Sequence, residues 1–200
     1  MSRPFVPHDY QREAIRFLRD TPRDGLWMPM GGGKGASTLT ALCDLDTFEP
    51  MFPALVLAPL RVANTTWVEE TAKWQHTEHL RVSPIAGRSN PLVSATADER
   101  AANLRKPADI YTIPYGSLTW LVDKLKDDWP FKTVIADEAT RLSSFRLRQG
   151  GKNAGALGKV AHLADRFIEL TGTPGGKGLP GLWGQSWFLD KGERLGHAFS

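Results

Sequence analysis

The rest of this chain is organised around the stretch Met30-Gly31-Gly32-Gly33-Lys34. It follows a short apolar run, Leu26 to Met28, and precedes a helix-like run, Ala36 to Leu45. A glycine-rich turn in that position lets backbone N–H groups approach phosphate oxygens, while lysine adds a positive charge and the following helix presents its positive end. The stretch alone is a weak signal, because most glycine-rich turns followed by lysine are ordinary loops.

The residue after the lysine departs from the usual phosphate loop. A loop that also holds Mg²⁺ has Ser or Thr directly after the lysine, whereas this chain has Gly35. Ser37 and Thr38 carry the next hydroxyl groups, but a displacement of two residues along a helix turns a side chain by about 200°. The sequence therefore predicts phosphate binding more strongly than metal ligation by a loop hydroxyl.

Composition limits the class of protein. The chain has 200 residues, 41% of them hydrophobic, which suits one globular domain. A net charge of +3 is compatible with a nucleic-acid partner without requiring one. The longest apolar run, Ala54 to Leu60, is too short to cross a bilayer, so no membrane association is expected. The single cysteine, Cys43, reads as a packed small residue and agrees with a reducing, cytoplasmic compartment.

Short apolar strands alternate with helices along the chain, which indicates an α/β fold with a mostly parallel sheet. Strands are predicted at Leu26–Met28, Ala54–Ala58, Arg81–Ile85, Ala108–Ile113, Thr133–Ala136 and Arg166–Leu170, the third of them near an edge because of Pro84. Helices are predicted from His8 or Asp9, and over Ala36–Leu45, Val62–Trp74, Ala95–Leu104 and Ser117–Leu125, with Ser117 as a candidate cap. Two glycine-rich stretches, Ser143–Gly158 and Gly175–Gly181, are expected to be loose loops.

Two acids, Asp137 and Glu138, directly follow the strand predicted at Thr133–Ala136. Ligands bind beyond the carboxyl ends of parallel strands, so these carboxylates should emerge where the phosphate loop also emerges. In nucleotide hydrolysis one acid organises Mg²⁺ and another orients or deprotonates the attacking water. The alternative is a helix N-cap after a strand, which also favours Asp and Glu.

Five motifs occur in an order that resembles the first RecA-like motor domain of superfamily 2 helicases. They are Tyr10-Gln11, Met30 to Lys34, Leu57-Ala58-Pro59-Leu60, Asp137-Glu138-Ala139-Thr140 and Thr171-Gly172-Thr173-Pro174. The segment Pro59 to Val62, followed by Trp67, Glu70 and Trp74, is similar to that of Swi2/Snf2-type ATPases, particularly the compact helicase-like proteins of bacterial viruses. The resemblance extends from about Phe5 to Phe188 and rests on the ordered set of motifs.

The resemblance implies one RecA-like P-loop domain over residues 1–200, with helices on both faces of a mostly parallel central sheet and without the second motor domain. It implies ATP and Mg²⁺ as cofactors and DNA, single- or double-stranded, as a partner bound without sequence preference. It also implies a second RecA-like domain or protein partner, and a host-cytoplasm location if the source is viral.

The resemblance further implies roles for individual residues. Gln11 would read the adenine edge, and Lys34 would contact the outer phosphates. Asp137 would act on Mg²⁺ and Glu138 on the hydrolytic water, which makes these two acids and Lys34 the catalytic set. The remaining assignments are Met30, Gly31, Gly32, Gly33, Gly35 and Ala36 for the nucleotide, Pro59, Arg61, Tyr115 and Ser117 for the nucleic-acid backbone, and Thr171 and Thr173 for coupling.

The sequence leaves turnover open. Motors of this family use an arginine from a second RecA-like domain, and related arginines contribute roughly 10³-fold or more. A degenerate RecA-like domain that binds DNA or protein without hydrolysing ATP is therefore the alternative. The basic stretch Arg141 to Ala164, which contains no acid, is either a DNA-contacting arm or a solvated loop. His76 and His79 are interpreted as a surface pair rather than a zinc site.

Overall fold

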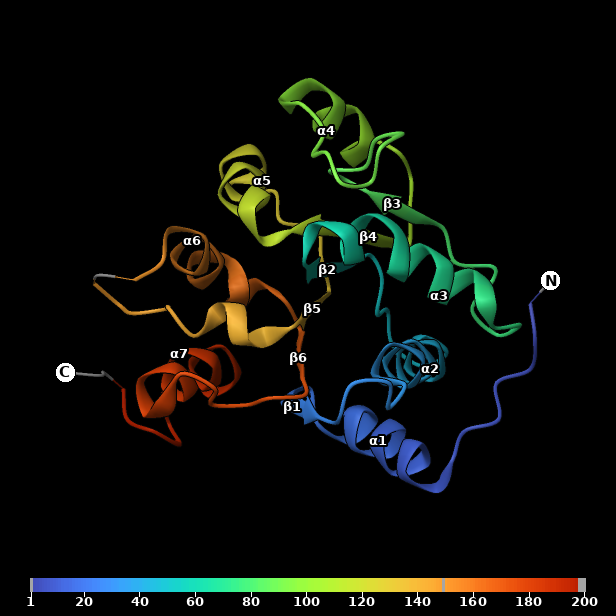
Figure 1. Cartoon of the computed structure of the whole chain (residues 1–200), viewed down its shortest axis with the longest axis horizontal. Helices are drawn as coiled ribbons and strands as arrows, with labels where there is room; N and C mark the ends of the chain where they lie inside the picture. The colour runs from blue at the N-terminus through green and yellow to red at the C-terminus, as the bar shows by residue number, and fades with distance from the viewer. Residues whose placement is uncertain (1, 149, 198–200) are drawn as a thin grey trace.

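The computed structural model describes residues 2–148 and 150–197. Within them lies a parallel six-stranded sheet with the order β1-β6-β5-β2-β4-β3 (Figure 1). The strands are β1 (Arg23–Trp27), β2 (Ala54–Ala58), β3 (Val82–Pro84), β4 (Ile110–Pro114), β5 (Thr133–Asp137) and β6 (Arg166–Thr171). The strand that carries Pro84 lies at the edge, as predicted, since proline cannot donate to a ladder on both sides.

Helices cover both faces of this sheet. The α-helices are α1 (Asp9–Asp20), α2 (Lys34–Asp46), α3 (Trp67–Lys73), α4 (Ala97–Leu104), α5 (Leu118–Leu125), α6 (Lys152–Val160) and α7 (Gly178–Asp190). Figure 1 shows α1, α2 and α3 on one side of the sheet and α5, α6 and α7 on the other. Shorter helical turns are η1 (Val62–Thr66), η2 (Tyr115–Ser117), η3 (Ala139–Leu142) and η4 (Ala161–Leu163). The predicted α/β fold with two helical layers is confirmed.

Strand alternation divides the core into two clusters. Leu55 and Leu57 of β2 join the cluster beneath α5, α6 and α7, whereas Val56 and Ala58 join the cluster beneath α1, α2 and α3. Side chains of successive strand residues point to opposite faces. A strand that is apolar at every position must therefore be covered on both faces, and this explains why β2 is fully buried.

The first strand is longer than predicted and begins at Arg23 rather than Leu26. Strands are predicted from apolar runs, and the first residues of this strand are polar. Arg23 donates hydrogen bonds to the carbonyl oxygens of Ala161 (2.7 Å), Ala164 (2.6 Å) and Phe188 (3.1 Å). Burial of its guanidinium lowers the pKa of Arg23. A charged side chain can thus occupy a strand position when main-chain carbonyls satisfy its donors.

The expectation of loose loops at Ser143–Gly158 and Gly175–Gly181 is wrong for the second half of each stretch, which is helical. The described residues before Lys152 and before Gly178 form turns and irregular structure, and Gln149 lies outside the described residues. Helix α6 begins at Lys152 and α7 at Gly178. Two of the glycines serve close packing, because a Cβ atom at Gly158 would lie 2.7 Å from Cε2 of Phe145 and one at Gly181 would lie 3.4 Å from Cβ of Ser143.

The basic stretch is likewise packed rather than a free arm. Phe145 is buried against Trp187 and Phe188, with ring centroids 4.4 and 4.7 Å away. Arg146 donates to the Ser143 carbonyl oxygen over 3.1 Å. Aromatic packing against α7 thus holds the part of the stretch around Phe145, whereas contact of its basic residues with DNA stays a prediction.

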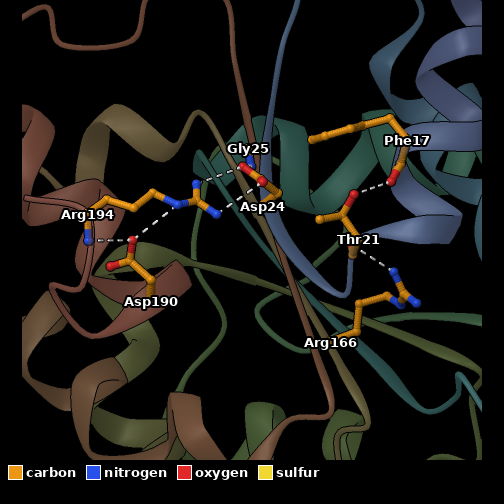
Figure 2. A network of polar contacts seen from close by, with 7 residues as sticks. All are labelled: Phe17, Thr21, Asp24, Gly25, Arg166, Asp190 and Arg194. Carbon is orange, nitrogen blue, oxygen red and sulfur yellow. Dashed lines mark hydrogen bonds and ion pairs between the residues drawn. The ribbon is translucent and has the colours of Figure 1, made fainter.

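Arg166 ties the start of β6 to the end of α1 (Figure 2). Its guanidinium donates to the carbonyl oxygens of Leu18 and, over 3.0 Å, Thr21. The hydroxyl of Thr21 donates in turn to the Phe17 carbonyl oxygen over 2.7 Å. These bonds satisfy carbonyl groups that a helix end leaves without partners.

A second polar group in Figure 2 joins the far end of the chain to β1. Arg194 lies between Asp24 of β1 and Asp190 of α7, and its ion pairs with both carboxylates measure 3.3 Å. The last described turn is thereby fixed beside the edge strand, on the other side of the sheet from α1.

Candidate nucleotide-binding site

All but one of the sequence-predicted site segments leave the same edge of the sheet. The strands are parallel, so the residues that follow β1, β2, β4, β5 and β6 gather at the carboxyl edge. This is where open α/β sheets bind ligands. Gln11, at the start of α1, is the one predicted site residue that does not follow a strand.

The glycine loop has a backbone that requires glycine. Gly31 and Gly33 have φ values of 78° and 82°, in the left-handed region, which glycine adopts without steric cost. A Cβ atom at Gly33 would also lie 2.2 Å from the Gln11 amide nitrogen. Helix α2 begins immediately afterwards, at Lys34, and its first N–H groups lack partners within the helix.

Gln11 braces this loop. Its side chain is 7% exposed. The amide nitrogen donates to the Gly32 carbonyl oxygen (3.1 Å), and the amide oxygen accepts from the His8 backbone N–H (2.9 Å). Both polar ends of the side chain therefore have partners within the protein, and contact with an adenine edge stays a prediction.

Lys34 folds back over the loop. Its ammonium group donates to the carbonyl oxygens of Met28 (2.8 Å) and Pro29 (3.1 Å). An ammonium group on a flexible stem can exchange such carbonyl partners for phosphate oxygens.

A cleft of about 650 Å³ opens beside the loop and α2. Asp137 lies in its lining together with Lys34, so the structure brings two of the three predicted catalytic residues to one cavity. The other predicted nucleotide-binding residues that line it are Gln11, Gly31, Gly33, Gly35 and Ala36. Met30 and Gly32 face elsewhere, into an apolar groove of about 690 Å³ beside Tyr10 and Phe17.

Asp137 ends β5 with both carboxylate oxygens hydrogen-bonded. Oδ2 accepts from the indole Nε1 of Trp67 over 3.0 Å, and Oδ1 accepts from the Glu138 backbone N–H over 3.0 Å. Burial raises the pKa of Asp137, while these two hydrogen bonds and the charge of Lys34 act in the opposite direction. The side chain is thus oriented before any ligand arrives.

Glu138 follows Asp137 but is not among the residues that line the cleft. It is exposed, has a φ of 55°, and its carboxylate lies 3.6 Å from the Nε atom of Arg141. Thr171 is buried and its hydroxyl oxygen accepts from the Thr173 backbone N–H over 3.1 Å, so the two predicted coupling residues are in contact. The catalytic and coupling roles of these residues remain predictions.

The residues predicted to lie along nucleic acid differ in accessibility. Arg61 is exposed and Pro59 is half-buried, but Tyr115 and Ser117 are 7% and 6% exposed. The hydroxyl of Tyr115 points inward and donates to the Asp137 carbonyl oxygen over 2.9 Å. Ser117 ends η2 and occupies the predicted N-cap position of α5, but its side chain makes no capping hydrogen bond. Gly116, between them, is exposed.

Sequence reasoning assigned no role to Trp67. It is 3% exposed and begins α3 directly after η1, a π-helical turn, where a single helix over Val62–Trp74 was predicted. Its position after the Pro59 to Val62 segment was visible in the sequence. The indole contact with Asp137 was not, because it joins residues 70 positions apart.

A site made of three or more potential metal ligands is not found among the described residues. His76 contacts Thr40, its Nε2 lying 2.8 Å from the hydroxyl oxygen, and stacks on Phe5. Mg²⁺ needs no such cluster, because it is commonly held by one or two carboxylates together with substrate phosphates. The carboxylate of Asp137, which lines the cleft beside the phosphate loop, therefore fits a magnesium–nucleotide complex.

A family model for the SNF2-related domain matches residues 10–192. The chain belongs to the SNF2-related domain family. A search of curated proteins finds protein p41 of Acyrthosiphon pisum secondary endosymbiont phage 1, which is 48% identical over 98% of this chain. The human DNA excision repair protein ERCC-6-like is 27% identical over 94% of it.

This SNF2-related domain spans only 42% of the phage protein and 15% of the human protein. Among solved structures, the Sulfolobus solfataricus SWI2/SNF2 ATPase core in complex with dsDNA superposes with a TM-score of 0.71, at 24% identity, covering 94% of this chain and 36% of that one. The UvsW helicase from bacteriophage T4 gives a TM-score of 0.64 at 13% identity, covering 94% and 60%. These likenesses confirm the RecA-like fold.

In the described part of the chain, every helix is too short or too polar to cross a membrane.

Proposed function

We propose that this SNF2-related domain is the nucleotide-binding half of a DNA-dependent ATPase or helicase-like translocase. The observation that carries the proposal is the common cleft lined by the phosphate loop, Lys34 and Asp137. Loop N–H groups and Lys34 bind phosphate oxygens, and Asp137 orients Mg²⁺, which when bound neutralises charge on the phosphates. Glu138 orients the attacking water.

We propose that DNA lies along the segments after β2 and β4, where Arg61 and Gly116 are exposed. A guanidinium and main-chain N–H groups bind phosphates without reading sequence. A second RecA-like domain, in a longer chain or a partner, supplies the arginine that completes the site. Hydrolysis by this chain alone is accordingly weak or absent.

The test is the melting temperature with and without ATP, in Mg²⁺ and in EDTA. Ligand at about 100 times its dissociation constant stabilises a fold by about 2.7 kcal/mol, which corresponds to about 5–10 °C for a domain of this size.

Lys34→Ala should weaken ATP binding by about 10- to 100-fold, the loss expected for hydrogen bonds to charged groups. Its own melting temperature should change little, because Lys34 is the first residue of α2 and lies outside both core clusters.

Lys132→Ala is the matched control, since Lys132 precedes β5 at the opposite edge of the sheet and forms only an exposed ion pair with Asp165. It should leave the ATP-induced shift unchanged. No shift in the unaltered chain at millimolar ATP, with DNA binding retained, would favour the alternative: a non-hydrolysing DNA- or protein-binding module. Gly35 favours that alternative, because it has no hydroxyl for Mg²⁺.

A further inference from the structure

Trp67 lies where the proposed nucleic-acid segment meets the proposed magnesium site. The chain leaves β2 at Ala58, passes Arg61 on the surface, and turns inward through η1. The backbone N–H of Trp67 donates to the Val62 carbonyl oxygen, which closes the wide π-helical turn. Such turns within helices are frequent at functional sites. Here the turn places the indole inside the protein, 3% exposed.

The indole fixes the carboxylate of Asp137. Trp67 Nε1 donates to Oδ2 over 3.0 Å while the Glu138 backbone N–H holds Oδ1 over 3.0 Å. With both oxygens held, the carboxylate keeps one orientation toward the cleft. A hydrogen bond to an ionised group is stronger than one between neutral groups.

A second contact reaches Asp137 from the other proposed nucleic-acid segment. Tyr115 begins η2, directly after β4, and its hydroxyl donates to the main-chain carbonyl oxygen of Asp137 over 2.9 Å. Tyr115 is itself buried, while the next residue, Gly116, is exposed. Segments that follow two different strands therefore converge on one acid, one through its side chain and one through its backbone.

We propose that Trp67 is a positioning residue for Asp137, and that with Tyr115 it transmits DNA occupancy of the segments after β2 and β4 to the magnesium–nucleotide site. The inference rests on the proposed function. When DNA fixes Arg61 and its neighbours, the π-helical turn is held, and the indole N–H keeps Asp137 in place for Mg²⁺. In return, a bound magnesium–nucleotide complex favours the conformation of both segments that binds DNA, because such coupling is reciprocal.

The experiment compares the unaltered chain with Trp67→Phe, which keeps an apolar ring and removes the N–H donor. Affinity for a non-hydrolysable ATP analogue is measured in EDTA, in Mg²⁺, and in Mg²⁺ with short duplex DNA. We expect Trp67→Phe to lower the Mg²⁺-dependent affinity by about 10- to 100-fold, as when a charged group loses a hydrogen bond. Affinity in EDTA should be unchanged, because the phosphate loop is intact. The affinity ratio with and without DNA should fall toward one.

The matched control is Trp129→Phe, since the buried indole Nε1 of Trp129 has no hydrogen-bond partner among the described residues. It should leave all three affinities unchanged. A general packing defect in Trp67→Phe would lower the affinity in EDTA as well, so an equal loss with and without Mg²⁺ would overturn the positioning role. Unchanged affinities in all three conditions would overturn it too.

Tyr115→Phe gives a second test, which can be carried out even if Trp67→Phe does not fold. It removes one hydroxyl, and it should reduce the effect of DNA on Mg²⁺-dependent affinity. An undiminished DNA effect would overturn the transmission step. Failure of the proposed function looks different, because the unaltered chain would then bind no nucleotide in any condition.

Discussion

At the scale of single residues, Gly35 is the position where this chain departs most sharply from a phosphate loop that holds magnesium. The structure shows that a side chain can be accommodated there. A Cβ atom at Gly35 would have Glu70 Cγ as its nearest neighbour, at 3.5 Å, an ordinary contact, and Gly35 lacks the positive φ of Gly31 and Gly33. The absence of a hydroxyl is therefore not forced by the fold.

Gly35→Thr should strengthen Mg²⁺-dependent nucleotide binding, because it places a hydroxyl at the position from which phosphate loops ligate the metal. We expect a gain of several-fold, consistent with about 1 kcal/mol for one added polar contact. The measurement is a titration of ATP in Mg²⁺ and in EDTA. Gly35→Ala is the control, since it adds the Cβ atom without the hydroxyl. Equal behaviour of the two variants would show that residue 35 is not at the metal-ligand position.

At the scale of elements, glycines, which are commonly loop formers, allow α7 to pack closely against its neighbour. Gly181 and Gly184 face the segment that follows η3, and a Cβ atom at Gly184 would meet the Ser143 carbonyl oxygen at 2.8 Å and its carbon at 3.1 Å. Backbone atoms cannot move aside as the end of a flexible side chain can. This close approach lets Phe145 pack with Trp183 and Phe188.

Gly184→Ala should destabilise the domain by about 1–3 kcal/mol, the usual cost of overpacking a close contact. Urea unfolding measures it. Gly155→Ala in α6 is the matched control, because a Cβ atom there has no neighbour within 4 Å. Removing a glycine from a helix interior should stabilise that variant by about 0.5–1 kcal/mol. Equal effects in the two helices would contradict the packing argument.

At the scale of the whole molecule, a buried acid in the sheet makes stability depend on pH. Glu169 of β6 is 1% exposed, and its Oε1 atom has no hydrogen-bond partner among the described residues. Burial raises its pKa well above the ordinary value of 4.5, and the negative charges of Asp24 and Asp190 raise it further. Arg194 forms ion pairs with both of these acids.

The raised pKa of Glu169 predicts how global stability depends on pH. Because the folded state binds the Glu169 proton more tightly than the unfolded state does, protonation of Glu169 adds to the free energy of unfolding. This contribution is complete below the unfolded-state pKa, near 4.5, and is lost as pH rises through the raised folded-state pKa. In Glu169→Gln this titration is absent. The melting temperature of the variant relative to the unaltered chain should therefore increase as pH rises above about 4.5, and then level off. A difference that stays constant between pH 4.5 and 9, in a series of buffers, would contradict the assignment.

Local signals in the sequence were sufficient for the alternation of elements and for the order of the site segments. The glycine loop before Lys34, the apolar run at Ala54–Ala58 and the acids Asp137 and Glu138 at the end of β5 are each recognised within a few residues. Local periodicity and turn chemistry determine such features, and parallel strands must then bring their carboxyl ends to one edge.

Tertiary structure decided what each side chain contacts. Tyr115 is buried and bonds to Asp137, Gln11 bonds to the glycine loop, and Trp67 bonds to Asp137. Each of these contacts joins residues far apart in the sequence. Helix α7 escaped prediction because glycines interrupt it and its apolar residues form no single stripe. Its stability comes from packing against Phe145 and Phe167, an interaction that exists only once the sheet has formed. Sequence pattern thus determined the fold and the location of the site, whereas long-range packing determined the orientation of the groups within it.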